Sequence, residues 1–234
     1  MSSVSGQRGR KVTERKQNPL TIFYLIVGGI VVIGIAALAT YTLWNRANPP
    51  VAAPTVPVGQ TEEGFWYKGN PDAPVTVTEY ADYQCPSCAY YERNLAPIIS
   101  RDYIETGKVK FVYHEVPLDS HRHAVAAAAA ARCAGEQNKF WQMHAMLYLN
   151  QQQWSPLNNV QNVFSGYAGQ LGLDRTAFDA CMSSGAQARA VTAAAEAAFA
   201  AGVNATPTFN VNGQIVDMRG LPGAIEAALR AAGK

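Results

Sequence analysis

The longest apolar stretch of the chain lies close to its N-terminus. Residues 20–43 form an uncharged run of 24 residues, and about 20 apolar residues in a helix are enough to cross a bilayer. Residues 1–19 carry five basic side chains and one acidic one, whereas Arg46 is the only charge close behind the run. The positive-inside rule therefore predicts a basic cytoplasmic tail, a membrane anchor, and an exported remainder.

A cleaved signal peptide is the alternative interpretation of the same run. Ala37-Leu38-Ala39 has the small-residue pattern of a cleavage site, but the apolar core of a signal peptide usually has only about 7–15 residues. The length therefore favours an uncleaved anchor. Both interpretations export the rest of the chain, so we expect an extracytoplasmic domain, and with the anchor a single-pass protein of the cell membrane.

After the run, the pattern changes to a proline-rich segment and then to strands and helices. Residues 44–63 contain four prolines among small residues, which predicts an extended linker. The folded domain is expected over 64–234. It opens with apolar alternation over 75–80, which predicts a strand. A helix from Pro86 to about residue 105 and a strand over 108–116 follow.

The middle of this domain, about 121–201, has helical periodicity and alanine-rich segments. Ser155-Pro156 predicts a helix start with Ser155 as N-cap, and Asp174 predicts the N-cap of a short helix that ends at Gly185. Beyond Gly202 the pattern returns to strands, and a last helix is expected after them. The order predicts an α/β fold: a mixed sheet flanked by helices, with an inserted helical domain.

The net charge of +2 at pH 7 conceals an uneven distribution. Residues 47–234 hold 13 basic and 16 acidic side chains, a net charge of −3. No stretch combines a basic patch with interleaved aromatic residues, so nucleic-acid binding is not expected. All four cysteines lie in the predicted exported part, where an oxidising compartment permits disulfides.

Two of these cysteines stand at the junction between the predicted strand and helix, in Cys85-Pro86-Ser87-Cys88. Proline is favoured at the first helical position, which makes Cys85 the N-cap and places Cys88 one turn inside. Free N–H groups and the helix dipole stabilise a thiolate at an N-cap. The spacing is that of a redox motif, and we expect Cys85 to be the attacked sulfur and Cys88 the resolving one.

Half of a zinc site is the alternative interpretation of this motif. Zinc needs a second closely spaced pair of ligands, but Cys133 and Cys181 are isolated and the four histidines show no ligand pattern. We therefore expect no metal. An organic cofactor is not expected either, because a disulfide can itself carry the electrons.

Three further positions bear on the chemistry. Glu79 shares a strand face with two valines, so it either points inward, where it can exchange a proton with Cys88, or reaches solvent at the strand end. Cys133 and Cys181 either pair, which closes a loop of about 50 residues worth about 4 kcal/mol, or stay as buried thiols. Thr206-Pro207 precedes the hairpin signal Asn212-Gly213, and a cis bond there would be a deliberate turn.

From about residue 64 to 234 the chain resembles the DsbA-like thiol-disulfide oxidoreductases of the thioredoxin superfamily. It is most similar to the membrane-anchored branch that carries an extra cysteine pair. The resemblance rests on four groups of residues: 77–88, 132–134 with 139–141, 178–181, and 202–209.

This resemblance implies roles for particular residues. Glu79 occupies the place of the family's buried acid. Thr206 and Pro207 match the cis-proline loop, whose backbone pairs with the substrate peptide. One position departs from the pattern, because the best-known oxidases have histidine where this chain has Ser87. A histidine helps to stabilise the thiolate, so Ser87 bears on how oxidising the disulfide is.

The leading hypothesis is a membrane-tethered, monomeric oxidase that introduces disulfides into exported cysteine-containing proteins. The resemblance further implies reoxidation by a quinone-linked membrane partner. A disulfide reductase or isomerase on the same scaffold is the first alternative. A chaperone that binds peptides without catalysis is the second.

Overall fold

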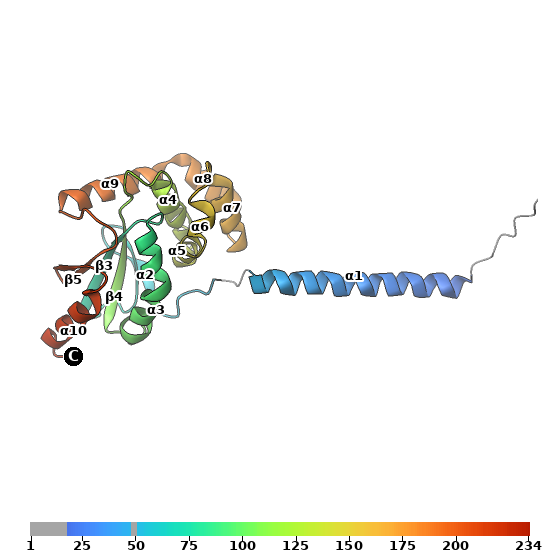
Figure 1. Ribbon diagram of the computed structural model, residues 1–234, viewed down its shortest axis with the longest axis horizontal. Coiled ribbons are helices and arrows are strands. Elements are labelled where there is room, and N and C mark those ends of the chain that lie inside the picture. The colour runs from blue at the N-terminus through green and yellow to red at the C-terminus, as the bar shows by residue number, and fades with distance from the viewer. Residues whose placement is uncertain (1–17, 48–50) are drawn as a thin grey trace, which may run out of the picture. The chain divides into compact units, whose positions relative to one another are not determined.

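The computed structural model describes residues 18–47 and 51–234. These fall into two separately compact units, divided at residue 50. The first unit contains helix α1 (Pro19–Ala47), which includes the uncharged run Leu20–Leu43 (Figure 1). By length and composition α1 can cross a membrane. The basic tail predicted over 1–19 lies almost wholly outside the described residues.

The second unit is built on a six-stranded mixed sheet with the order β1-β2-β4-β3-β5-β6. Strands β3 and β4 at its centre run parallel, and all other neighbours are antiparallel. The strands are β1 (Val58–Gln60), β2 (Trp66–Lys68), β3 (Val75–Ala81), β4 (Val109–Glu115), β5 (Thr208–Val211) and β6 (Gln214–Val216).

Helices pack around this sheet, and six of them, α4 to α9, form the insertion between β4 and β5. Figure 1 shows the insertion gathered at one end of the sheet. The helices outside the insertion are α2 (Pro86–Asn94), α3 (Ala96–Ile99), the π-helical turn η1 (Ser100–Ile104) and α10 (Leu221–Ala231). Those of the insertion are α4 (Ala124–Gly135), α5 (Phe140–Leu149), α6 (Gln151–Trp154), α7 (Gln161–Gln170), α8 (Arg175–Ser184) and α9 (Ala186–Ala200).

The alternation in β3 fixes which side chains enter the core. Val75, Val77, Glu79 and Ala81 are all completely buried, and the residues between them are half-buried. Glu79 pairs in register with Tyr113 on β4 and lies opposite a residue of β5 on the other side. The strand thus carries one carboxyl into the core of the sheet, directly ahead of the loop that leads to α2.

Several local signals act as the sequence predicts. Asp174 caps α8 by accepting a hydrogen bond from the Ala177 N–H at 3.1 Å, and Gly185 ends that helix in the left-handed region at φ 67°. Asn212 and Gly213, with φ of 47° and 96°, turn the chain between β5 and β6. A disulfide between Cys133 and Cys181 ties α4 to α8.

The helix start predicted at Ser155 is wrong. Ser155 follows the end of the short helix α6, and the next helix, α7, begins only at Gln161. The oxygens of Ser155 have another use, because its carbonyl and hydroxyl both lie 3.2 Å from the Gln84 side-chain amide, which donates to them. A contact across 71 residues of sequence thus replaces the local cap.

Part of the segment predicted as a linker, 44–63, belongs to folded elements. α1 extends to Ala47, and β1 pairs with β2, which in turn borders β4. Val51 and Val56 pack against the hydrophobic core. Prolines and small residues indicate an extended chain, but they do not show whether that chain is free or lies along a surface.

Candidate active site

The two cysteines of the C-x-x-C motif stand at the N-terminus of α2. Cys85 is the N-cap in extended conformation, with φ −70° and ψ 123°, and Pro86 opens the helix. Both cysteines are free thiols. Cys88 is completely buried and Cys85 keeps 6% of its surface exposed, so only Cys85 presents an edge to a partner.

The environment makes the two thiols unequal. The pKa of Cys85 is lowered to about 5, chiefly by the hydrogen bond from the Cys88 thiol, with help from Thr206 and from the N–H groups of Cys88 and Ser87 against the effect of burial. Burial raises the pKa of Cys88 well above its ordinary value, and the neighbouring Cys85 adds to the rise. At neutral pH Cys85 is therefore a thiolate and Cys88 a thiol.

Glu79 lies inside the protein beneath this pair. Its side chain is completely buried, so the alternative in which it reaches solvent does not hold. Neither carboxylate oxygen has a hydrogen-bond partner among the residues that the structure describes. Burial first, and then the carboxyl of Glu92, raise the pKa of Glu79 well above its ordinary value. Both effects favour the neutral form of this carboxyl.

The loop before β5 closes the site from the other side. The Thr206-Pro207 peptide bond is cis, and the Cys85 sulfur lies 3.4 Å from the Thr206 carbonyl oxygen, to which it donates in its protonated form. The structure therefore brings Cys85, Cys88, Glu79, Thr206 and Pro207 to one place. Cys133 and Cys181 are bonded to each other in the insertion and do not take part in this cluster.

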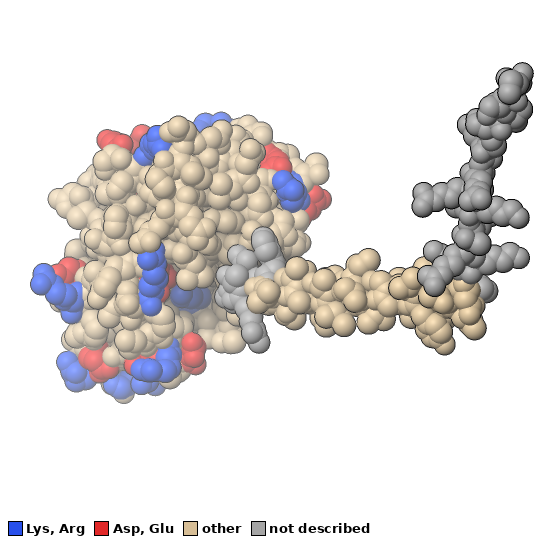
Figure 2. Space-filling model, turned by 45° about the vertical axis from the view of Figure 1, so that its right-hand side comes forward, with Lys and Arg blue, Asp and Glu red and all other residues tan. Residues whose placement is uncertain are grey.

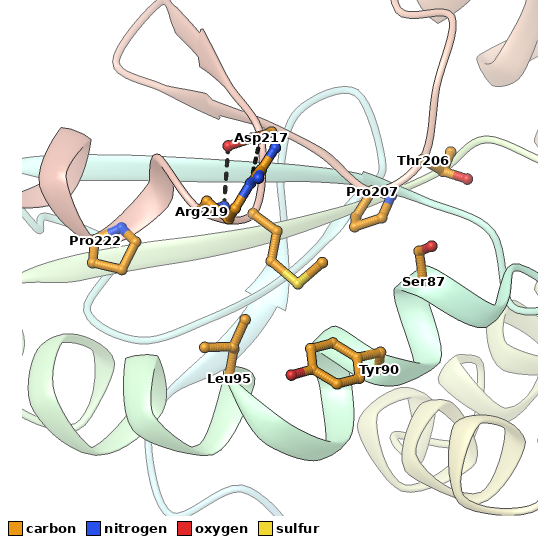
Figure 3. Close-up of a pocket in the computed structure, with 9 residues that line it drawn as sticks. Ser87, Tyr90, Leu95, Thr206, Pro207, Asp217, Arg219 and Pro222 are labelled. Atoms are coloured by element: carbon orange, nitrogen blue, oxygen red, sulfur yellow. Dashed lines mark hydrogen bonds and ion pairs between the residues drawn. The ribbon is translucent and has the colours of Figure 1, made fainter.

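A groove of about 630 Å³ runs beside the motif. Figure 3 shows Ser87 and Tyr90 on α2 at one side, with Pro207 across from Ser87. Asp217 and Arg219, which pair at 3.4 Å, line it farther along. The groove is partly apolar, because Leu95, Met218 and Pro222 also line it.

The loop that carries Cys85 is held by residues that sequence reasoning missed. Gln151, from α6, donates its side-chain amide to the carbonyls of Tyr83 at 2.8 Å and of Cys85 at 2.9 Å. Asp82 is buried and accepts from the Gln84 N–H and from Leu118. These contacts join distant parts of the chain, and no local pattern announces them.

Two further titratable residues, Glu92 and His144, also escaped the sequence analysis. His144 Nε2 lies 3.2 Å from Glu92 Oε1, and its Nδ1 lies 3.1 Å from the hydroxyl of Tyr83. Glu92 comes one helical turn after Cys88, a spacing that places both on one face of α2. The spacing between Cys88 and Glu92 is the one signal that the sequence offered for the pair of Glu92 and His144.

The described part of the chain holds no cluster of three or more His, Cys, Asp or Glu residues placed to bind a metal ion. On the face shown in Figure 2, basic and acidic side chains are interspersed, with wide uncharged areas between them.

A thiolate at a helix N-cap, a buried second thiol and a cis-proline loop across from them are the features of a thiol-disulfide exchange site. A family model described as thioredoxin matches residues 60–230, which is more than half of the chain. The chain belongs to the thioredoxin family, and within it the chain is similar to the DsbA-like thiol-disulfide oxidoreductases. The fold class predicted from the sequence is confirmed.

Known proteins of this kind are similar over most of the second unit. The crystal structure of oxidised BdbD from Bacillus subtilis superimposes with a TM-score of 0.66 at 26% identity, covering 75% of this chain and 98% of that one. Disulfide bond formation protein D of Bacillus subtilis is 35% identical over 109 residues, which are 46% of this chain and 47% of that protein.

A longer stretch of this chain is similar to part of a protein that is named as an antiporter. Na(+)/H(+) antiporter NhaA 3 of Salinispora tropica is 36% identical over 148 residues, which are 63% of this chain but only 21% of that protein. The chain thus spans about a fifth of that relative and about half of the Bacillus protein.

Proposed function

We propose that this oxidoreductase works as an oxidase, introducing disulfides into exported cysteine-containing proteins. The observation that carries the proposal is the pKa of Cys85, which is lowered to about 5. A thiolate that is stabilised in this way favours the reduced enzyme over its disulfide. The Cys85–Cys88 disulfide is therefore a strong acceptor of electrons from a substrate dithiol.

The reaction has two displacements. A substrate thiolate attacks the Cys85 sulfur, and Cys88 leaves with the electron pair of the broken bond. Because Cys88 has a raised pKa, it takes a proton, for which Glu79 is the proposed donor. The second substrate thiolate then attacks the substrate sulfur of the mixed disulfide. Cys85 leaves as a stable thiolate, and the substrate carries away the new disulfide.

The remaining parts of the chain suit this role. Thr206 and Pro207 are the proposed platform for the substrate backbone, and Pro86 and Ser87 shape the motif. We assign residues 20–43 as an uncleaved anchor with a cytoplasmic N-terminus and residues 64–234 as the extracytoplasmic catalytic domain, acting as a monomer. A quinone-linked membrane protein is the proposed reoxidant. The support for these assignments is the flanking charge and the family resemblance.

Trapping in cells tests the direction of electron flow. In Cys88→Ala the lone Cys85 thiolate can still attack a disulfide of an exported protein, the reverse of the oxidation step, and expel a client thiolate. Because Cys88 is absent to release the bound client, exported proteins with cysteines are expected to accumulate on Cys85. The double variant Cys85→Ala/Cys88→Ala is the matched control and is expected to trap nothing. Recovery of a reductant donor alone, without exported clients, contradicts the oxidase and favours the reductase.

A further inference from the structure

The groove beside the motif carries its charge at one end. Among the described residues that line it, Asp217 and Arg219 are the charged ones, and they pair with each other at 3.4 Å. Figure 3 shows Ser87 and Pro207 at one end of the groove, with Asp217 and Arg219 lying toward Leu95 at the other. The part of the groove next to the reactive sulfur is therefore uncharged, and a charged group stands only farther along.

The negative charge of Asp217 is already held by the backbone. Its Oδ1 accepts hydrogen bonds from the N–H of Arg219 at 3.0 Å and from the N–H of Gly220 at 2.9 Å. Gly220 is the N-cap of α10, so this carboxylate also lies near the positive end of a helix dipole. These contacts, that of Gly220 first, lower the pKa of Asp217 below its ordinary value. The carboxylate thus serves the start of α10.

The guanidinium of Arg219 is much less committed. Within the described part of the chain its hydrogen bonding is limited to Nε, which donates to Asp217 Oδ2 at 3.4 Å. A close charge-assisted bond has a length of about 2.7–2.9 Å. The side chain of Arg219 is 93% exposed. Both terminal amino groups can therefore donate to a carboxylate that enters the groove, and the planar fork suits a bidentate contact.

The length of the groove sets where along a bound client this contact falls. The groove begins at the reactive sulfur, because Cys85 lies 3.4 Å from the carbonyl of Thr206, and Thr206 and Ser87 both line the groove. From Ser87 to Leu95 at the C-cap, α2 rises by about 12 Å. An extended peptide covers that distance in about three or four residues. The charge that its side chains then meet is that of Arg219.

We propose that Arg219 is a specificity-determining residue, which selects clients with an acidic side chain about three or four residues from the cysteine that bonds to Cys85. The proposal rests on the proposed function, because it needs a client segment in the groove. The Arg219 guanidinium binds the client carboxylate, whereas a client lysine at the same place meets a like charge. The contact lies away from the sulfur, so it changes which client is bound and leaves the exchange chemistry as it is.

The test is a competition between peptides for Cys85 of the full-length Cys88→Ala protein in a glutathione buffer. Each peptide has one cysteine, and Glu or Gln stands three or four residues from it, on its N-terminal side in one series and on its C-terminal side in the other. Mass spectrometry gives the ratio of the two mixed disulfides on Cys85. This ratio is divided by the ratio in which the same peptides bond to glutathione, which removes any difference in the acidity of their thiols.

The Glu peptide is expected to exceed the Gln peptide about threefold in one of the two series, which is the size of an exposed ion pair. In about 1 M NaCl, where the screening length is about 3 Å, the preference is expected to disappear. A Glu directly beside the cysteine is expected to give no preference, because the groove is uncharged there.

Charge reversal assigns the preference to one side chain. Arg219→Glu is expected to invert the ratio, so that the Gln peptide exceeds the Glu peptide about threefold. Arg230→Glu is the matched control, since Arg230 is an exposed arginine on α10 that does not line the groove. Its ratio is expected to equal that of the protein with both arginines. Arg219→Gln, which is expected to abolish the preference, is the second variant if Arg219→Glu does not fold, as thermal unfolding reports.

Three results overturn the proposal. They are equal binding of the Glu and Gln peptides in both series, a preference that survives Arg219→Glu, and a preference that Arg230→Glu removes to the same extent. The competition is an equilibrium and does not depend on the direction of electron flow. A failure to trap exported clients in cells, with the ratios as expected, therefore rejects the oxidase and leaves the selection by Arg219 standing. Trapped clients with equal ratios reject the selection and leave the oxidase.

Discussion

The molecule contains two pairs of cysteines, and they differ in nearly every physical respect. Cys85 and Cys88 are free thiols, separated by two residues at the start of a helix, and the hydrogen bond from Cys88, with help from the helix N–H groups, lowers the pKa of Cys85. Cys133 and Cys181 are bonded across a sequence separation of 48, far from a helix N-terminus and without a buried acid beside them. Cysteine sulfur thus serves exchange in one pair and cross-linking in the other, and the close spacing of the first pair at a helix terminus makes the difference.

Removal of the attacked sulfur is expected to have the largest effect on the difference in exchange rate between the two cysteine pairs. Cys85→Ser is expected to lower the rate of dithiol oxidation by about a thousandfold or more, because covalent exchange has no other accessible thiol. Stopped-flow oxidation of a peptide dithiol measures it. The double variant Cys133→Ala/Cys181→Ala is the control, and a comparable loss of rate there would show that the second pair also exchanges.

The same double variant is expected to lose stability instead. In the chain-entropy model, a cross-link that closes a loop of this length contributes about 4 kcal/mol. Urea unfolding at pH 7 measures the free energy, with the exchange rate of the folded variant close to that of the wild type. An unchanged midpoint would mean that the disulfide does not restrict the unfolded chain and so does not stabilise the fold.

Glu79→Gln is expected to change how the free energy of unfolding depends on pH. The pKa of Glu79 is raised in the folded state, so the folded protein holds a proton that the unfolded chain releases above about pH 4.5. Stability from this group is present below that pH and is lost as pH rises toward the folded pKa. The variant is therefore expected to lose less stability than the wild type between pH 4 and pH 7 in urea unfolding. Its oxidised form is also expected to form mixed disulfides about tenfold more slowly, because Cys88 then leaves without the proton of Glu79. An equal loss of stability in both proteins would contradict a buried neutral acid.

Ser87→His is expected to give the smallest effect. A histidine inside the motif adds a donor and a partial positive charge near the thiolate, which lowers the pKa of Cys85 below its value of about 5. The midpoint of the thiolate absorbance should move to lower pH, and the reduction potential should rise, as glutathione equilibration measures. Ser87→Ala is the control, and a midpoint that stays in place in both variants would show that this side chain does not influence the sulfur.

The features that could be predicted from the sequence are those whose cause is local. Cys85 at its N-cap, Asp174 at the start of α8 and Asn212-Gly213 in the hairpin each depend on residues within one turn of themselves. The apolar alternation of β3 placed Glu79 on the core face, but it left open whether the strand end was covered. The burial of Glu79 is decided by α2 and β5, which the pattern of β3 does not describe.

The features that could not be predicted depend on contacts across long stretches of chain. His144 reaches Tyr83 across 61 residues, and Gln151 reaches Cys85 across 66. Ser155 carries a cap signature and is used for a contact with Gln84 instead. In each case a polar side chain in the insertion satisfies a group in the catalytic loop, and periodicity carries no information about such pairs.

The amide of Gln151 links the chemistry to the mechanics of the fold. One side chain from α6 holds the carbonyls on both sides of Gln84, so the loop cannot open unless α6 moves with it. The start of the catalytic helix and the middle of the insertion should therefore open as one cooperative unit in hydrogen exchange. The insertion then restrains the loop that carries Cys85, so that the distance between this sulfur and the cis-proline loop stays fixed while partners bind and dissociate.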